Sequence, residues 1–307
     1  MIQKTTTLPW EHPKLQEEDP QSLELIETIM KSPTYTMAEQ DSEFMNSYEA
    51  RGIRLELDYL KAELKMKKYG IEHTIVVFGS ARIVERKTAL KRLRTIEEMV
   101  HDNPEDRTLL RELYIAERMV EKSIYYDDAR KFGALVGKSG ETVEDCRVTL
   151  MTGGGPGIME AANRGAYDVG AKSIGLNIKL PHEQYPNPYI TPDLCFLFHY
   201  FAIRKLHFLN RARALVVYPG GFGTFDELFE TLTLIQTHKS NTIPVVLIGK
   251  NYWKKAIDFE FLKEEGVIAP EDLDVFIFAD DAEEAWRYIV SWHRNLGNPL
   301  FEEDMEK

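Results

Sequence analysis

Two glycine-rich segments of this 307-residue chain have the composition of loops that hold a phosphate. One is Thr152-Gly-Gly-Gly-Pro-Gly-Ile-Met-Glu160 and the other is Pro219-Gly-Gly-Phe-Gly-Thr-Phe-Asp-Glu227. Glycine lets a ligand approach the backbone, and a helix that follows offers free N–H groups and a positive dipole end. A tight strand-to-helix turn would explain either loop alone. Two such loops together favour a phosphate site.

Neither segment fits the common nucleotide fingerprints. A dinucleotide loop has a third glycine in GxGxxG, but that position is Glu160 in one segment and Asp226 in the other. Neither contains GxxxxGK[ST], the triphosphate-binding pattern. A nucleoside monophosphate is therefore the better match.

The second segment ends in a carboxylate, Glu227, at a spacing that could place it beside a bound phosphate. If a helix starts near Gly223, then Thr224, Glu227 and Thr231 share one face. Thr224 would then contact the phosphate, and Glu227 would lie near the sugar. A bound dianion raises the pKa of such a carboxyl by like-charge repulsion, so Glu227 could act as a base or stabilise positive charge. The alternative is an ordinary first-turn glutamate, favoured by the helix dipole.

A basic cluster precedes this segment in a chain whose net charge is −12. Its members are Arg204, Lys205, His207, Arg211 and Arg213. Arg204, His207 and Arg211 share a helical face, so at least one guanidinium could reach a phosphate or a departing base. A solvated basic face is the common alternative, but the contrast with the acidic total favours an anion site.

The elements that must position these residues form an α/β pattern. Short apolar runs with strand character alternate with amphipathic helices, and they cover residues 74–78, 147–151, 172–177, 214–218, 244–248 and 275–278. This order predicts a doubly wound, Rossmann-like parallel sheet with helices on both faces. Ligands bind beyond the carboxyl ends of such strands, so the loops after Phe78, Met151 and Tyr218 should form the site.

The residue pattern changes near residue 70, and it predicts a helical N-terminal extension, residues 1–70, and a nucleotide-binding catalytic domain, residues 71–307. Helical periodicity covers residues 23–32 and 42–68 of the extension. The second segment carries an imperfect apolar stripe that should lie on the core or on a partner subunit. Its members are Phe44, Tyr48, Ile53, Leu55, Tyr59, Leu60 and Leu64.

Composition excludes several classes of protein. A hydrophobic content of 43% is too high for a disordered chain. No apolar run approaches the ~20 residues that span a bilayer, and no secretory signal is visible. Cys146 and Cys195 lack CxxC spacing, which predicts a cytoplasmic protein without a disulfide or a zinc site. Excess acidic charge argues against nucleic-acid binding. We expect neither a metal nor a cofactor.

The two glycine-rich segments and the Arg204-Lys205 pair together resemble the Lonely Guy (LOG) family of nucleoside 5′-monophosphate phosphoribohydrolases, historically labelled lysine decarboxylase-like. The resemblance covers roughly residues 74–292, and PGGxGTxxE is its most specific motif. It implies cleavage of the bond between base and ribose 5-phosphate in AMP or related purine or cytokinin nucleotides. Arg204 and Glu227 match the catalytic pair of the family.

The resemblance also implies binding roles. The phosphate loop would comprise Gly220, Gly221, Gly223 and Thr224. The ribose or base side would comprise Ser80, Gly154, Gly155, Met159 and Lys205. The family further implies a homo-oligomer, a dimer or a hexamer, with the active site near a subunit interface. The extension and the insert at residues 88–138 depart from the compact plant-type members.

Two alternatives remain open from the sequence. The decarboxylase label predicts pyridoxal phosphate on a lysine, for which Lys205 is the candidate, although no cofactor constellation surrounds it. A non-catalytic nucleotide or molybdenum-cofactor carrier of the same fold is the second alternative. A carrier does not require the Arg204 and Glu227 pair, so that pair favours an enzyme.

Overall fold

The computed structural model describes residues 13, 17–139, 148–180, 185–297 and 300. Cys146 and the first residue of the strand expected at 147–151 lie outside this part. The chain forms two compact units, Met1–Leu57 and Asp58–Lys307. This division falls inside a helix, before the boundary after residue 70 that sequence texture predicts, because Ala62 and Met66 of that helix belong to the core beside the sheet.

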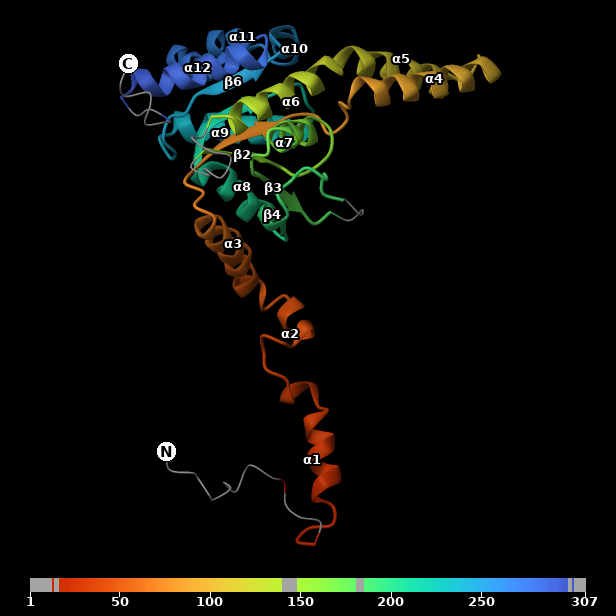
Figure 1. Cartoon of the computed structure of the whole chain (residues 1–307), viewed down its shortest axis with the longest axis vertical. Coiled ribbons are helices and arrows are strands. Elements are labelled where there is room, and N and C mark those ends of the chain that lie inside the picture. The colour runs from red at the N-terminus through yellow and green to blue at the C-terminus, as the bar shows by residue number, and fades with distance from the viewer. Residues whose placement is uncertain (1–12, 14–16, 140–147, 181–184, 298–299, 301–307) are drawn as a thin grey trace. The chain divides into compact units, whose positions relative to one another are not determined.

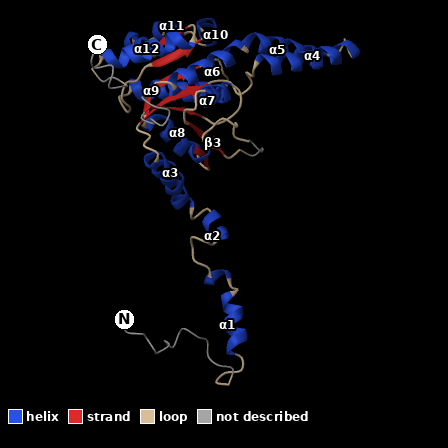
Figure 2. Cartoon of the chain, in the orientation of Figure 1, coloured by secondary structure: helices blue, strands red, loops and turns tan. Residues whose placement is uncertain are grey.

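A seven-stranded parallel sheet forms the centre of the second unit (Figure 2). Its strands are β1 (His73–Phe78), β2 (Val148–Thr152), β3 (Ser173–Ile178), β4 (Cys195–Phe198), β5 (Ala212–Val217), β6 (Val245–Ile248) and β7 (Phe276–Ala279). Their order is β4-β3-β2-β1-β5-β6-β7, and every neighbouring pair is parallel. The predicted doubly wound α/β fold is confirmed.

All six expected strands are present to within about two residues, and β4 is the one that sequence patterning misses. This edge strand has only four residues. Phe196 and Phe198 are buried, as expected for core positions, while Leu197 between them is exposed. A pattern this short is too weak to separate a strand from a loop.

Helices cover both faces of the sheet (Figure 1). One face carries α3 (Arg51–Lys68), α8 (Phe201–Asn210), α9 (Phe222–Gln236), α10 (Lys250–Ala256) and α11 (Phe259–Glu264). The other carries α6 (Ile124–Gly137), α7 (Ile158–Asp168) and α12 (Ala282–Asn295). Strand β1 serves both cores by alternation: Val76 and Phe78 face the first set, and Ile75 and Val77 the second.

The structure has further helical elements besides these. They are α1 (Ser22–Met30), α2 (Ser42–Asn46), α4 (Arg86–Asp102), α5 (Arg107–Lys122) and the short 3₁₀ turns Pro33–Tyr35, Pro192–Leu194 and Pro270–Val275. The helix expected over residues 42–68 is two helices, α2 and α3, because the backbone of Ser47 is extended. Among the helices described, none has both the length and the apolarity needed to cross a membrane.

Helix α3 holds α8 at both of its ends. The Asp58 carboxylate accepts hydrogen bonds from the backbone N–H groups of His199 (2.8 Å) and Tyr200 (3.0 Å), at the start of α8. At the other end, Glu63 accepts two bonds from the Arg211 guanidinium, at 2.6 and 2.8 Å. These contacts fix the helix that carries Arg204.

Two members of the predicted basic cluster therefore serve the fold. Arg211 pairs with Glu63, and His207 is fully buried, where its ring stacks on Tyr59 at 5.0 Å. The sequence predicts that at least one guanidinium of this helical face could reach a phosphate or a departing base, and Arg204 is the one that lines the cavity described below. His207 and Arg211 are engaged by residues of α3, namely Tyr59 and Glu63. Of the three residues, only Arg204 lines this cavity.

Glycines allow α6 and α7 to approach closely. A Cβ atom added at Gly133 would lie 2.0 Å from the Ala162 carbonyl oxygen, and one added at Gly165 would lie 1.8 Å from the Arg130 carbonyl oxygen. No side chain fits between the two backbones. This contact seats α7 against the sheet, and α7 begins directly after the first glycine-rich segment.

We expect Gly133→Ala to lower the free energy of unfolding by about 1–3 kcal/mol, because the helices must move apart. Urea denaturation followed by circular dichroism measures the change. Gly52→Ala in α3 is the matched control, since its Cβ would meet no heavy atom within 4 Å. The control should be neutral or raise stability by up to about 0.5 kcal/mol. Equal losses from the two substitutions would contradict the close-packing argument.

Candidate active site

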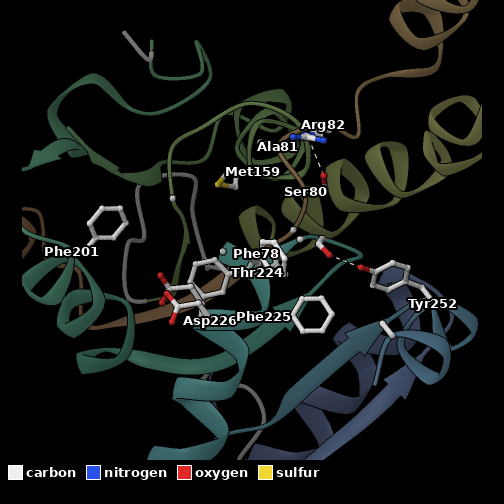
Figure 3. Close-up of a pocket in the computed structure, with 18 of the residues that line it drawn as sticks. Phe78, Ser80, Ala81, Arg82, Met159, Phe201, Thr224, Phe225, Asp226 and Tyr252 are labelled. Atoms are coloured by element: carbon white, nitrogen blue, oxygen red, sulfur yellow. Dashed lines mark hydrogen bonds between the residues drawn. The ribbon is translucent and has the colours of Figure 1, made fainter. Parts of the chain in front are cut away.

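A cavity of about 810 Å³ lies beyond the carboxyl ends of β1 and β5 (Figure 3). The strand order reverses between these two strands, and this is the position where ligands of doubly wound sheets bind. The volume suits a small ligand of nucleotide size. Eight of the predicted site residues line it: Ser80, Met159, Arg204, Gly220, Gly221, Gly223, Thr224 and Glu227.

The loops that follow β1, β2 and β5 are joined through Ser80. Its backbone N–H donates to the Pro219 carbonyl at 3.0 Å, and its carbonyl accepts from the Ile158 N–H at 3.1 Å. Its hydroxyl accepts from the Arg82 N–H at 3.1 Å. One residue thus fixes the spacing between both glycine-rich segments. The predicted convergence of the three loops is confirmed.

The second segment shapes the start of α9. Gly221 is the N-cap of the helix, and no side chain caps it. Thr224 is buried with its hydroxyl against Gly220, where an added Cβ would lie only 2.1 Å from Oγ1. The Tyr252 hydroxyl donates to the Gly220 carbonyl and turns that oxygen toward α10 (Figure 3). The free N–H groups of the first turn of α9 are then the natural partners of an anion.

One turn further along α9, the Glu227 carboxylate is buried beside two cations. As predicted, Thr224, Glu227 and Thr231 lie on the same buried face of the helix. Glu227 Oε1 is 3.7 Å from an Arg204 terminal nitrogen, and Oε2 is 3.9 Å from Lys205 Nζ. Burial raises the pKa of the Glu227 carboxyl to about 7, although Lys205 and Arg204 oppose the shift. Near neutral pH this group can accept or donate a proton.

The Arg204 guanidinium has an N–H group that is not used in a hydrogen bond with any described residue. Its guanidinium packs 5.4 Å from the ring centre of Phe201 and 5.3 Å from that of Phe208. Nε is buried without a hydrogen-bond partner among the described residues. Burial lowers the pKa of the guanidinium, and the charges of Glu227 and Asp226 oppose this. A buried donor without a partner is costly, so a ligand that accepts from Arg204 would gain binding energy.

Lys205 differs from its neighbour. It does not line the cavity, and its ammonium lies 2.9 Å from Asp226 Oδ2 and 2.9 Å from Glu230 Oε2. Burial acts to lower the pKa of Lys205, but hydrogen bonds to Asp226 and Glu230 outweigh it and raise the pKa. A Schiff-base lysine must be neutral to react. Lys205 therefore does not fit the pyridoxal phosphate hypothesis.

The first segment contributes less than expected to the cavity wall. Gly153 and Met159 line the cavity, whereas Gly154 and Gly155 are not among its lining residues. Their carbonyls accept bonds from Asn187, at 2.9 Å from its backbone N–H and 3.1 Å from its side-chain amide. Gly154 has φ +72°, a conformation that favours glycine. A ribose or base contact of Gly154 and Gly155 stays a prediction.

The sequence reasoning missed several residues of the wall, among them Phe201, Phe222, Phe225 and Tyr252. Tyr252 lies on α10, after β6, the neighbour of β5, so its position at a strand end was an available signal. Phe201 and Phe222 had no such signal, because aromatic residues at helix starts are equally common in cores. In the structure Phe222 is 97% exposed.

Comparisons with known proteins agree with the motifs. Residues 159–289 match a family model described as "Possible lysine decarboxylase". The chain is 28% identical over 153 residues to the rice (Oryza sativa subsp. japonica) protein named Probable cytokinin riboside 5′-monophosphate phosphoribohydrolase LOGL3, covering 45% of this chain and 65% of that protein. It is 27% identical over 168 residues to LOG3 of Arabidopsis thaliana, named cytokinin riboside 5′-monophosphate phosphoribohydrolase, covering 53% and 73%.

These matches confirm the resemblance to the LOG family that the motifs predict. The match to the rice protein spans just under two thirds of that protein's length. Both matched regions of this chain are also partial, so the residues outside them have no counterpart in the comparison.

Two solved structures are similar at low identity. One is the molybdenum cofactor binding protein from the phototrophic bacterium Rippkaea orientalis, with a TM-score of 0.39 and 22% identity over 55% of this chain and 87% of that one. The other is a structural-genomics target with a TM-score of 0.41 and 18% identity, covering 71% and 98%.

The raised pKa of Glu227 predicts a pH-dependent gain in stability for Glu227→Gln. A folded-state pKa near 7, against an ordinary 4.5, means that the stability contributed by the neutral carboxyl is lost as pH rises through this window. The amide stays neutral, so the variant should exceed the wild type by about 3 kcal/mol above pH 7 and match it near pH 4.5.

Urea unfolding at a series of pH values between 5 and 8 measures this difference. Glu117→Gln, which neutralises an exposed carboxylate on α5, is the control and should show no such trend. A difference between Glu227→Gln and wild type that stays constant with pH would contradict the assignment.

Proposed function

We propose that this protein hydrolyses the N-glycosidic bond of nucleoside 5′-monophosphates and releases the free base and ribose 5-phosphate. The observation that carries the proposal is the position of Glu227. A buried carboxyl with a pKa near 7 lies one helical turn beyond a capless helix start, in the cavity that also holds Arg204. The named activity of the two plant relatives supports the same reaction.

In the proposed complex the substrate would lie along α9. The 5′-phosphate would accept hydrogen bonds from the first-turn N–H groups and the Thr224 hydroxyl, where the helix dipole favours negative charge. The ribose would then lie over Glu227. The base would extend toward the β1 and β2 loops, where Ser80 and Met159 line the wall. Modified purines such as cytokinins belong to the same substrate class.

Cleavage breaks the bond between C1′ and the base nitrogen, whose electron pair leaves with the base. Positive charge develops on the ribose, and the Glu227 carboxylate stabilises it and takes a proton from the attacking water. Water supplies hydroxide to C1′ and, in the overall balance, a proton to the departing base. Arg204 donates hydrogen bonds to the substrate and assists the leaving base. No redox or cofactor step is required.

The mouth of the cavity supports a second part of the proposal. Phe201 and Phe222 both line the cavity and are 51% and 97% exposed. Large aromatic side chains in such positions are typical of protein contacts. A homo-oligomer with the active site near a subunit interface therefore stays part of the proposal.

Base release from a panel of nucleoside 5′-monophosphates, beginning with AMP, tests the reaction. We expect Glu227→Gln and Arg204→Met each to lower kcat by about 10²–10⁴. Glu117→Gln should match the wild type, and adenosine should be a poor substrate because it lacks the phosphate. Free base and ribose 5-phosphate are quantified by chromatography. Binding of AMP without release of base by the wild type would favour the carrier alternative.

The pH profile tests the role of Glu227 separately. Glu227 acts as an anion, so kcat/KM should rise with pH and level off above about pH 7, following the pKa of that carboxyl. The residual activity of Glu227→Gln should lack this step, which separates it from titration of the substrate phosphate. A rate that falls as pH rises through 7 would indicate that the protonated carboxyl is the active form.

A further inference from the structure

The start of α9 leaves three consecutive backbone N–H groups without a partner. They belong to Gly221, Phe222 and Gly223, and none of them donates to any described residue. The next two N–H groups, those of Thr224 and Phe225, both donate to the Gly221 carbonyl. All five residues line the cavity. Consecutive free N–H groups form an anion-binding concavity, provided that each peptide is held in the right orientation.

A residue outside this segment fixes the first of the three peptides. The Tyr252 hydroxyl donates to the Gly220 carbonyl (Figure 3). The peptide that joins Gly220 to Gly221 is trans, so its C=O and N–H groups point in opposite directions. Holding the carbonyl toward Tyr252 therefore keeps the Gly221 N–H turned away from it. Neither flanking residue has a Cβ, so the backbone alone restrains this peptide only weakly.

Tyr252 is itself held in place. Its neighbour Trp253 is fully buried and donates from Nε1 to the Ile248 carbonyl at 3.0 Å, which anchors α10 on β6. The Tyr252 N–H donates to the Gly249 carbonyl at 2.9 Å. The Lys122 ammonium lies 5.6 Å from the centre of the Tyr252 ring. Because the donor is already ordered, a ligand that uses the oriented loop does not have to offset the cost of ordering it.

The Tyr252 hydroxyl does not serve the ligand directly. A phenol has one proton to donate, and Gly220 takes it, while a phosphate dianion offers only acceptors. We propose that Tyr252 is a positioning residue, which orients the peptide between Gly220 and Gly221 so that the Gly221 N–H donates to the 5′-phosphate of the ligand. Tyr252 thereby sets the preference for phosphorylated ligands. This inference rests on the phosphate-binding role of α9 in the proposed function.

Calorimetric titration of the full chain with ribose 5-phosphate tests the inference, because this probe carries the phosphate and is a product that the proposed reaction does not consume. Tyr252→Phe removes the hydroxyl and keeps the ring. It should weaken ribose 5-phosphate binding about three- to tenfold, the effect of losing one hydrogen bond. Adenosine, which lacks the phosphate, should bind the variant and the wild type equally. Tyr114→Phe is the matched control and should match the wild type, since the exposed Tyr114 hydroxyl makes no hydrogen bond with any described residue.

The kinetics of AMP hydrolysis supply a second readout. Tyr252→Phe should raise KM by a similar factor and change kcat by less than about twofold, because the lost contact holds the phosphate and leaves Glu227 and Arg204 in place. A merely structural role would lower kcat as well, since a displaced cavity wall would disturb those two residues.

Three results would overturn the inference: undiminished affinity of Tyr252→Phe for ribose 5-phosphate, an equal loss of affinity for adenosine, or no saturable binding of ribose 5-phosphate by the wild type. Failure of the proposed function has a different signature. A wild type that releases no base from AMP, together with weakened ribose 5-phosphate binding in Tyr252→Phe, supports the positioning role and refutes the hydrolase. Normal hydrolysis by the wild type with unchanged affinity in the variant refutes the positioning role alone.

Discussion

The reversal of strand order between β1 and β5 is the constraint on which the site depends. Connections that leave β1 and β2 run through α6 and α7 on one face, while those after β4 and β5 run through α8 and α9 on the other. The loops after β1 and β5 must therefore diverge, and they leave a crevice that no helix fills. Ser80 spans its base and joins both sides. The other residues of the cavity wall lie around this crevice.

The charge distribution in the crevice depends on how deeply each member of one group of ionised side chains is buried. The group comprises Arg204, Lys205, Asp226, Glu227 and Glu230. Glu227 and Arg204 have side chains only 8% and 13% exposed, whereas Asp226 is 61% exposed. Arg204 and Lys205 are adjacent in sequence, as are Asp226 and Glu227. Adjacent residues of a helix point in different directions, so the two members of each pair lie in different surroundings. Lys205 binds the acids at the rim, and Arg204 keeps a donor free inside. A chain with an excess of acidic residues can thus hold an anion locally, because a few oriented groups outweigh the distant surface charge.

Sequence patterning predicts the sheet well because buried parallel strands are continuous apolar runs, and it predicts the glycine loops because their backbone needs are specific. It fails where the deciding information is tertiary. Arg204 and Arg211 have the same type and lie on the same helical face, yet one lines the cavity and the other binds Glu63, some 150 residues away in the chain. Asn187 donates hydrogen bonds to the carbonyls of Gly154 and Gly155, and no local pattern connects it to them. Tyr252 reaches Gly220 only through the adjacency of β5 and β6.

The contacts between α3 and α8 also set a limit on how far this chain can be shortened. A fragment that starts at the first strand would retain the whole sheet and every residue of the cavity wall. It would nevertheless lose the carboxylate that caps the arginine-bearing helix and the partner of Arg211, and it would remove Ala62 and Met66 from the core cluster to which Phe208 belongs. The smallest fragment that keeps these contacts therefore begins within α3, upstream of Asp58, and not at β1.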